Sequence, residues 1–255
     1  MLLAAFLAAV LLLGRQHFQL VVAIIVALAG YEWIRLCGGG KVFFAAYAAL
    51  CVLAYFAVLQ LPGAPLASLL VATAFWMLVA PLWLARGLPQ GASDWLPGAG
   101  LIVLVPAGVA MALMSPQQLL QLIGLTVVAD SAAYFTGRAF GKRKLAPAIS
   151  PGKTWEGVAG GAIGCAIYAI IWVVFDAEMR AKIQDEIWIP FLAGSMLLCA
   201  LSVTGDLFES ALKRHAGVKD SGRLLPGHGG VLDRIDSATA VLPVGALLLH
   251  WITAA

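Results

Sequence analysis

The stretch VFFAAYAALCVLAYFAVLQ, residues 42–60, contains no charged side chain. An α-helix needs about 20 consecutive apolar residues to cross the roughly 30 Å hydrocarbon core of a bilayer, and this stretch has that length. Similar apolar runs lie on both sides of it, at residues 1–13, 18–36, 66–84, 97–114, 117–136, 157–175, 188–204 and 238–253. The sequence therefore predicts an all-α, polytopic integral membrane protein with about nine transmembrane helices. Because the run 1–13 is short, eight is the fallback count.

The composition of the chain agrees with this class. Of its 255 residues, 62% are hydrophobic and only 11% are Asp, Glu, Lys or Arg, whereas a soluble domain carries about 25% charged residues. The four cysteines are scattered without a C-x-x-C spacing, and we interpret them as small hydrophobic residues. No basic stretch precedes the first apolar run, which favours a retained span over a signal peptide.

The basic residues are distributed unequally between the two sides of the membrane. With nine spans, the loops after spans 2, 4, 6 and 8 carry thirteen of the 16 basic residues, and Arg15, Arg180 and Lys182 lie opposite. The positive-inside rule then predicts that these loops face the cytoplasm, in the cell inner membrane. The two long polar segments, 137–156 and 205–237, share that face if both intervening apolar runs cross.

Four carboxylates flank the second polar segment. Asp206 and Glu209 lie three apart in TGDLFES, and Asp233 and Asp236 lie three apart in LDRIDS. Residues three apart share a helix face, so each helix end is expected to present two carboxylates to one point. Hard oxygen ligands of this kind suit Mg²⁺, whose shell is completed by water and substrate phosphate. The alternative is that they are solvated charges paired with nearby Lys and Arg.

Basic residues and glycines lie between these carboxylates. The basic or potentially basic residues are Lys213, Arg214, Lys219, Arg223, His228 and Arg234. Carboxylates for a metal beside cations for anions are the groups that phosphoryl or nucleotidyl transfer requires. In PGHGG, Gly229 and Gly230 let backbone N–H groups approach an anion closely, although a turn back into the membrane would need glycines as well.

The first polar segment has a similar content. TGRAFGKRKLAPAISPGKTWEG, residues 136–157, carries five cations but does not satisfy the P-loop spacing. Membrane topology or attraction of anionic lipid heads would explain the cations, but not the interleaved Ser150, Thr154 and Glu156. In the helix that follows, Gly157, Gly160, Gly161 and Gly164 have the spacing of a close helix-packing face.

Asp130 lies inside an apolar run, in VVADSAAYFTG. A carboxylate in a membrane span costs roughly 2.5–3.5 kcal/mol on insertion scales, so such residues usually face a polar interior. Asp130 is expected either at the floor of a site entered from the cytoplasm or as the structural partner of a buried cation.

These stretches together resemble a known family. SALKRHAGVKDSGRLLPGHGGVLDRID, residues 210–236, closely resembles the motif of the phosphatidate cytidylyltransferases, and ADSAAYFTGRAFGK, SPGKTWEG and GDLFES resemble the other stretches of that family in order. The resemblance covers about residues 125–240, and the first 120 residues match only as apolar spans. Gly152 stands where family members often have lysine.

The resemblance implies that CTP and phosphatidate react to give CDP-diacylglycerol and pyrophosphate, with Mg²⁺ and a second, monovalent cation such as K⁺ as cofactors. It implies Asp206, Asp233 and Asp236 as metal ligands. The implied catalytic residues are Asp206, Lys213, Arg214, Lys219, Asp220, His228, Asp233, Arg234 and Asp236. The implied substrate-binding residues are Asp130, Arg138, Lys142, Ser150, Lys153, Thr154, Glu156, Arg223, Gly229 and Gly230.

The expected organisation is an N-terminal set of transmembrane helices, 1–120, and a C-terminal catalytic region, 121–255, with cytoplasmic loops 137–156 and 205–237. The expected partners are CTP, phosphatidate, membrane lipids and a second copy in a homodimer, and no nucleic acid. A CTP-dependent lipid kinase needs the same metal and nucleotide groups but would release CDP. A transporter is disfavoured, because the polar residues gather at one face and the N-terminal half has no counterpart of them.

Overall fold

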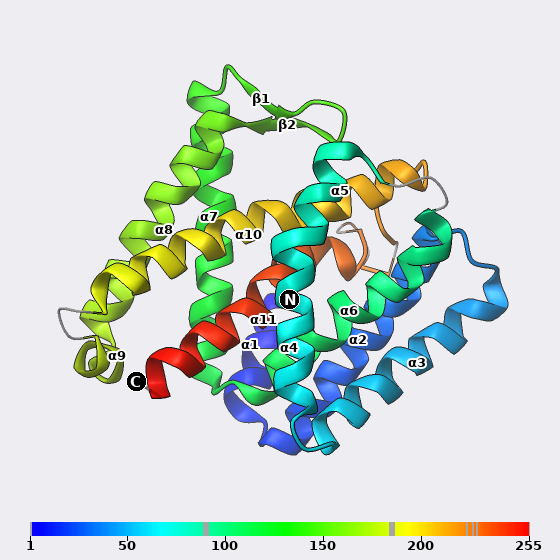
Figure 1. Ribbon diagram of the computed structural model, residues 1–255, viewed down its shortest axis with the longest axis horizontal. Helices are drawn as coiled ribbons and strands as arrows, with labels where there is room; N and C mark the ends of the chain where they lie inside the picture. Colours follow the sequence, from blue (N-terminus) through cyan, green and yellow to red (C-terminus); the bar gives the residue numbers. More distant parts are fainter. Residues whose placement is uncertain are drawn as a thin grey trace.

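The computed structural model describes residues 2–88, 92–183, 187–222, 224–225, 227 and 229–254. The N-terminal half contains α1 (Leu2–Leu12), α2 (Arg15–Leu36), α3 (Lys41–Gln60), α4 (Ala64–Ala74), the π-helical turn η1 (Phe75–Val79), α5 (Ala80–Arg86) and α6 (Ala92–Leu113). The C-terminal half contains α7 (Pro116–Phe140), β1 (Lys144–Ala146), β2 (Ser150–Thr154), α8 (Trp155–Phe175), α9 (Ala177–Lys182), α10 (Trp188–His215) and α11 (Leu232–Ala254) (Figure 1).

Eight helices within the described residues are long and apolar enough to cross a membrane. They are α2, α3, the continuous helix 64–86 formed by α4, η1 and α5, α6, α7, α8, α10 and α11. The fallback count of eight is therefore confirmed. The remaining apolar run, 1–13, forms only α1. Its 11 residues extend for about 17 Å, which is too short to cross a bilayer core.

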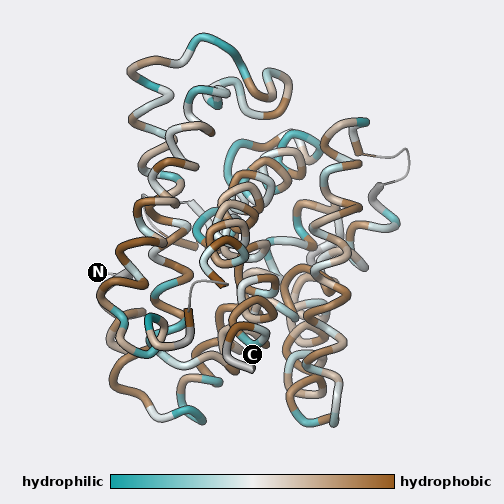
Figure 2. Tube along the Cα trace, turned by 60° about the vertical axis from the view of Figure 1, so that its left-hand side comes forward, coloured by the Kyte–Doolittle hydropathy of each residue, from teal (hydrophilic) through white to brown (hydrophobic). Residues whose placement is uncertain are grey.

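The two polar segments lie at the same end of the helix bundle (Figure 1). Figure 2 shows hydrophobic residues along the helices and hydrophilic residues gathered at their ends. The segment 205–237, expected as a loop, is a loop only over 216–231, because α10 continues to His215 and α11 begins at Leu232. The apolar residues Phe208 and Leu212 are buried, which explains why the helix continues past Asp206 and Glu209.

The first polar segment contains a β-hairpin that the sequence analysis did not predict. Strands β1 and β2 pair antiparallel, with Lys144 opposite Thr154 and Ala146 opposite Ser150. Glu156 closes the base of this hairpin, because its carboxylate accepts backbone N–H bonds from Lys142 and Arg143 at 3.1 Å. With so little sheet, the prediction of an all-α membrane protein is confirmed.

Helix α8 packs closely on α7 through its glycines, as the spacing predicted. A side chain at Gly160 would overlap Thr136, and one at Gly164 would come within 2.8 Å of the Ala132 methyl group. The close contact fixes α8, and with it the end of β2, against the helix that carries Asp130.

Aromatic side chains from the N-terminal half hold α10 in place. Phe208 of α10 lies among Trp33 of α2, Phe75 and Trp76 of η1, and Trp83 of α5, with ring centroids 5.5 to 6.3 Å apart. The π-helical turn that contributes two of these rings precedes Pro81, whose missing N–H removes a helical hydrogen bond. Because Phe208 lies between Asp206 and Glu209 in the sequence, this aromatic cluster positions both carboxylates.

Candidate functional site

A cavity of about 350 Å³ opens between α7, β2, α8 and α10. Its polar lining includes the predicted site residues Asp130, Arg138, Ser150, Lys153, Thr154 and Asp206. Its apolar lining includes Ala133, Tyr134, Val158 and Val203. The cavity therefore offers charged groups and an apolar wall to the same ligand.

Three carboxylates from three helices gather beside this cavity. Asp130 of α7, Asp206 of α10 and Asp236 of α11 are close enough for their charges to act on one another. Lys153 of β2 forms an ion pair with Asp206, with 2.7 Å between Nζ and Oδ2. We call these four residues the cavity cluster.

The hydrogen bonds that the cavity cluster receives are few and long. The Ser202 and Ser237 hydroxyls lie 3.4 Å from the two Asp130 oxygens, and the Ser210 hydroxyl donates to Asp206 at 3.3 Å. Asp236 accepts one short bond, from the backbone N–H of Ser237 at 2.7 Å. Within the described residues, these three carboxyl groups have one ion-paired cation, Lys153, and their remaining oxygen lone pairs are available to a ligand.

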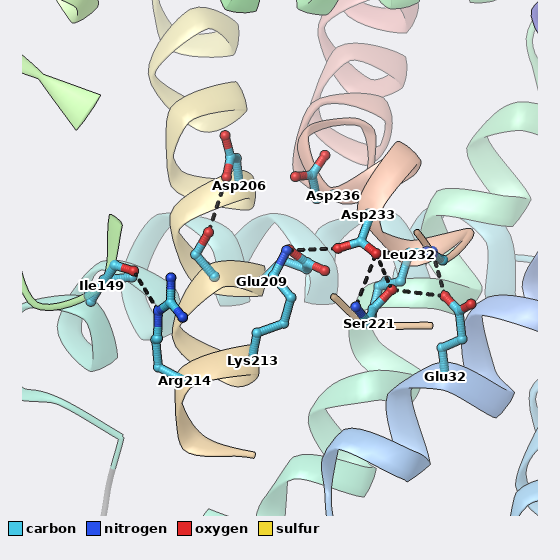
Figure 3. Close-up of polar contacts among 12 residues, drawn as sticks. Glu32, Ile149, Asp206, Glu209, Lys213, Arg214, Ser221, Leu232, Asp233 and Asp236 are labelled. Carbon is cyan, nitrogen blue, oxygen red and sulfur yellow. Dashed lines mark hydrogen bonds and ion pairs between the residues drawn. The ribbon is translucent and has the colours of Figure 1, made fainter. Parts of the chain in front are cut away.

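A second charged cluster lies around Lys213 and has a different character. The Lys213 ammonium group contacts Glu209 on the same helix and lies 2.7 Å from Asp233 Oδ1 on α11. Asp233 Oδ2 accepts hydrogen bonds from the Ser221 N–H at 3.0 Å, the Ser221 hydroxyl at 2.9 Å and the Gly230 N–H at 2.8 Å. We call Glu209, Lys213, Ser221 and Asp233 the loop cluster, because they join both ends of the loop 216–231 (Figure 3).

The structure therefore separates the carboxylates that lie three apart. Figure 3 shows Asp206 and Asp236 on one side, and Glu209 and Asp233 beside Lys213. Residues three apart differ by about 60° around a helix axis, so neighbouring side chains can belong to different clusters. The prediction that Asp206 with Glu209, and Asp233 with Asp236, would each present both carboxylates to one point is therefore wrong.

Other predicted residues hold the local structure together. The Thr154 hydroxyl accepts the Gly157 N–H at 3.1 Å and caps α8. The Arg214 Nε donates to the Ile149 carbonyl at 3.3 Å and joins α10 to the hairpin. A side chain at Gly229 would come within 2.7 Å of Asp233 Oδ2, so glycine is needed there for packing.

The remaining predicted residues are exposed or lie outside the described residues. Exposed side chains include Arg138, Lys142, Lys219, Asp220 and Arg234. Arg223 and His228 lie outside the described residues.

No group of three or more His, Cys, Asp or Glu within the described residues converges as a metal site. Of the three predicted ligands, Asp206 and Asp236 belong to the cavity cluster. The oxygens of Asp233, the third, are taken up by Lys213, Ser221 and Gly230.

Sequence reasoning missed a contribution from the N-terminal half. Glu32 of α2 is fully buried and accepts hydrogen bonds from Ser221 and Leu232, and Arg35 donates to the Ser221 carbonyl. The signal was present, because Glu32 is a carboxylate within an apolar run, as Asp130 is.

Fold and site together define a multi-pass membrane protein with an oxygen-rich, charged cavity at one end of its helix bundle. The chain belongs to the cytidylyltransferase family, whose sequence profile matches residues 1–252. The phosphatidate cytidylyltransferase of Pseudomonas aeruginosa is 40% identical over 252 residues, which cover 93% of this chain and 89% of the relative.

Other relatives match a shorter part of the chain with higher sequence identity. The phosphatidate cytidylyltransferase of Haemophilus influenzae is 54% identical over 125 residues, 49% of this chain and 43% of the relative. That of Thermotoga maritima is 48% identical over 125 residues, 48% of this chain and 45% of the relative.

Proposed function

We propose that this protein transfers the cytidylyl group of CTP to phosphatidate, giving CDP-diacylglycerol and pyrophosphate. The observation that carries the proposal is the cavity cluster, in which three carboxylates and Lys153 lie beside a cavity with an apolar wall. The names of the relatives and the family membership support the same reaction.

The reaction joins a lipid phosphate to the α-phosphorus of CTP. A phosphatidate oxygen forms the new P–O bond, the bond between the α-phosphorus and the bridging oxygen breaks, and pyrophosphate leaves with that oxygen. Phosphatidate is already an oxyanion near neutral pH, so no strong general base is required. What the protein has to supply is orientation and neutralisation of charge.

The donor set of the cavity cluster fits a hard divalent cation. Carboxylate oxygens suit Mg²⁺, and Asp206 and Asp236 would hold it with Asp130 in support. When bound, Mg²⁺ would neutralise the charge that develops on the phosphate oxygens. Asp233 as a ligand and a monovalent cation such as K⁺ stay predictions.

Lys153 and Arg138 would bind the anionic substrates. Both line the cavity, and Lys153 is held near α10 by its ion pair with Asp206. The apolar side chains of Tyr134 and Val158 lie in the same lining, where the hydrocarbon part of a lipid would be accepted without desolvation of charge.

The test of the reaction uses purified protein in detergent with labelled CTP, phosphatidate and Mg²⁺. We expect a labelled CDP-lipid and pyrophosphate in equal amounts. Release of CDP with a newly phosphorylated lipid would instead identify a lipid kinase, and the absence of any lipid product would refute the proposal.

We also propose that both polar segments face the cytoplasm in the inner membrane and that the protein forms a homodimer. The orientation follows from the unequal distribution of basic residues. Single cysteines in the hairpin and in the loop 216–231, in a chain without its native cysteines, should resist a membrane-impermeant reagent in intact cells. Labelling of either segment from outside would overturn the orientation, and the molar mass in detergent tests the dimer.

A further inference from the structure

Helix α2 reaches the loop 216–231 through a buried carboxylate. Glu32 has no exposed surface, although it follows a long apolar stretch of α2. Its Oε2 accepts a hydrogen bond from the Ser221 hydroxyl at 3.0 Å and from the Leu232 N–H at 2.8 Å. One carboxylate thus binds both the segment that follows α10 and the first residue of α11 (Figure 3).

The chain around Glu32 is built to fit it. A side chain at Gly222 would overlap Glu32, and a side chain at Gly230 would overlap both Glu32 and Ser221. One turn along α2, Arg35 donates to the Ser221 carbonyl. Two residues of α2 therefore fix Ser221 at its side chain and at its backbone.

Ser221 passes this constraint on to Asp233. Its hydroxyl lies 3.0 Å from Glu32 and 2.9 Å from Asp233 Oδ2, and its N–H donates to the same Asp233 oxygen. The single hydroxyl proton is shared between two acceptors, so the position of Ser221 depends on both carboxylates. Asp236 lies one helical turn after Asp233 on α11 and belongs to the cavity cluster.

We propose that Glu32 is a positioning residue for the reaction: through Ser221 and the Leu232 N–H it sets the placement of the start of α11, and thereby of Asp233 and Asp236. Glu32 is not among the residues that line the cavity, and the described groups that donate hydrogen bonds to it are Ser221 and the Leu232 N–H. The effect on turnover rests on the proposed function, whereas the effect on the loop does not.

The variants that test this separate position from stability. Glu32→Gln keeps the size of the side chain and removes its charge, and Ser221→Ala removes the hydroxyl that joins Glu32 to Asp233. Tyr55→Phe is the matched control, because it removes a buried hydroxyl of the N-terminal half that donates to the Gln19 carbonyl, far from the loop in sequence.

We expect Glu32→Gln to lower kcat at least tenfold with the KM for CTP changed less than threefold, measured per folded molecule. Ser221→Ala should lower kcat similarly. The kcat of the double variant should be no lower than that of the less active single variant. Additive losses, or a wild-type kcat in both single variants, would overturn the proposal. Ser221→Ala supplies the test if Glu32→Gln does not fold.

Hydrogen exchange gives a second readout that does not depend on catalysis. Amides of residues 218–222 and 229–232 should exchange at least tenfold faster in Glu32→Gln, and at the wild-type rate in Tyr55→Phe. Unchanged exchange in Glu32→Gln would overturn the positioning role. If the wild-type protein formed no CDP-lipid, only the proposed function would be refuted. The hydrogen-exchange result would still decide whether Glu32 holds the loop.

Discussion

The cavity cluster and the loop cluster both combine acidic residues of α10 and α11 with one lysine, yet they differ in what their charges contact. In the cavity cluster, Asp206 forms a short ion pair, and the hydrogen bonds to Asp130 from the described residues are long. In the loop cluster, both oxygens of Asp233 are satisfied by Lys213, Ser221 and a backbone N–H. Carboxylates with spare acceptor capacity can bind a ligand, whereas satisfied ones hold the chain in place.

The largest effect is expected in the cavity cluster. Asp206→Asn and Asp236→Asn keep the size of the side chain and remove the anion. Loss of one ligand of the proposed Mg²⁺ should reduce kcat at least 100-fold, about 2.7 kcal/mol at 1.36 kcal/mol per decade. The measurement is turnover at saturating Mg²⁺, together with a melting curve in detergent.

We expect the melting temperatures of these two variants to stay close to that of the wild type. Near-normal turnover in both would remove the distinction between the two clusters, because Asp206 and Asp236 would then have no ligand to bind.

Substitutions in the loop cluster should lower the stability of the folded protein. Lys213→Met leaves Glu209 and Asp233, which are 4% and 9% exposed, without their shared cation. Breaking a buried ion pair on one side costs about 3–5 kcal/mol, which should lower the melting temperature by on the order of 10 °C. Lys213→Arg is the control, since it keeps the charge. An unchanged melting temperature in Lys213→Met would show that the cluster does not hold the loop.

A substitution of Asp130 tests whether this residue of a membrane-spanning helix takes part in the cavity cluster. Asp130→Asn should lower kcat about tenfold and shift the half-saturating Mg²⁺ concentration upwards, because one anion near the proposed Mg²⁺ would be lost. If Asp130 were only structural, the same change would lower the melting temperature and leave the Mg²⁺ dependence as it was. A Mg²⁺ titration and a melting curve on the same preparation distinguish the two.

The smallest effect is expected at the opposite end of the bundle, where Asp176 caps α9. Burial opposes its ionisation, but hydrogen bonds from the Met179 N–H and from Gln121, Trp172 and Gln117 outweigh it and lower its pKa. A lowered folded-state pKa stabilises the protein above the unfolded value of about 3.9, and this contribution is lost as pH falls further.

Asp176→Asn should therefore lower the melting temperature slightly at neutral pH. Below about pH 4, the melting temperature of the variant should fall less with decreasing pH than that of the wild type. Turnover at neutral pH should be unchanged. A loss of turnover comparable to that of Asp236→Asn would contradict the assignment of the site to the other end.

The parts of the fold that depend on local sequence were predictable, and the parts that depend on distant pairing were not. Uninterrupted apolar runs such as 42–60 predicted helices because length and hydrophobicity suffice for a span. The hairpin over residues 144–154 was missed, since its strands are short and bounded by charged residues. The polar segments, and the charged residues that line the cavity, stood out in the sequence because charge is rare in this chain.

The division of the site into two clusters could not have been predicted from spacing. Asp233 and Asp236 share a helix turn, and only the fold brings Lys213 to the first and Asp206 towards the second. The part played by Glu32 depends on a residue 189 positions later in the chain, and no local pattern encodes such a contact.

The contact between Glu32 and Ser221 also bears on how the protein is made. At synthesis rates of about 5–20 residues per second, the 189 residues that separate them take roughly 10 to 40 s to translate. During that interval α2 is already synthesised, and the groups that bind its carboxylate do not yet exist. Until α11 is made and completes the bundle, the newly made protein therefore holds an acidic residue in α2 without the partners that the finished fold gives it.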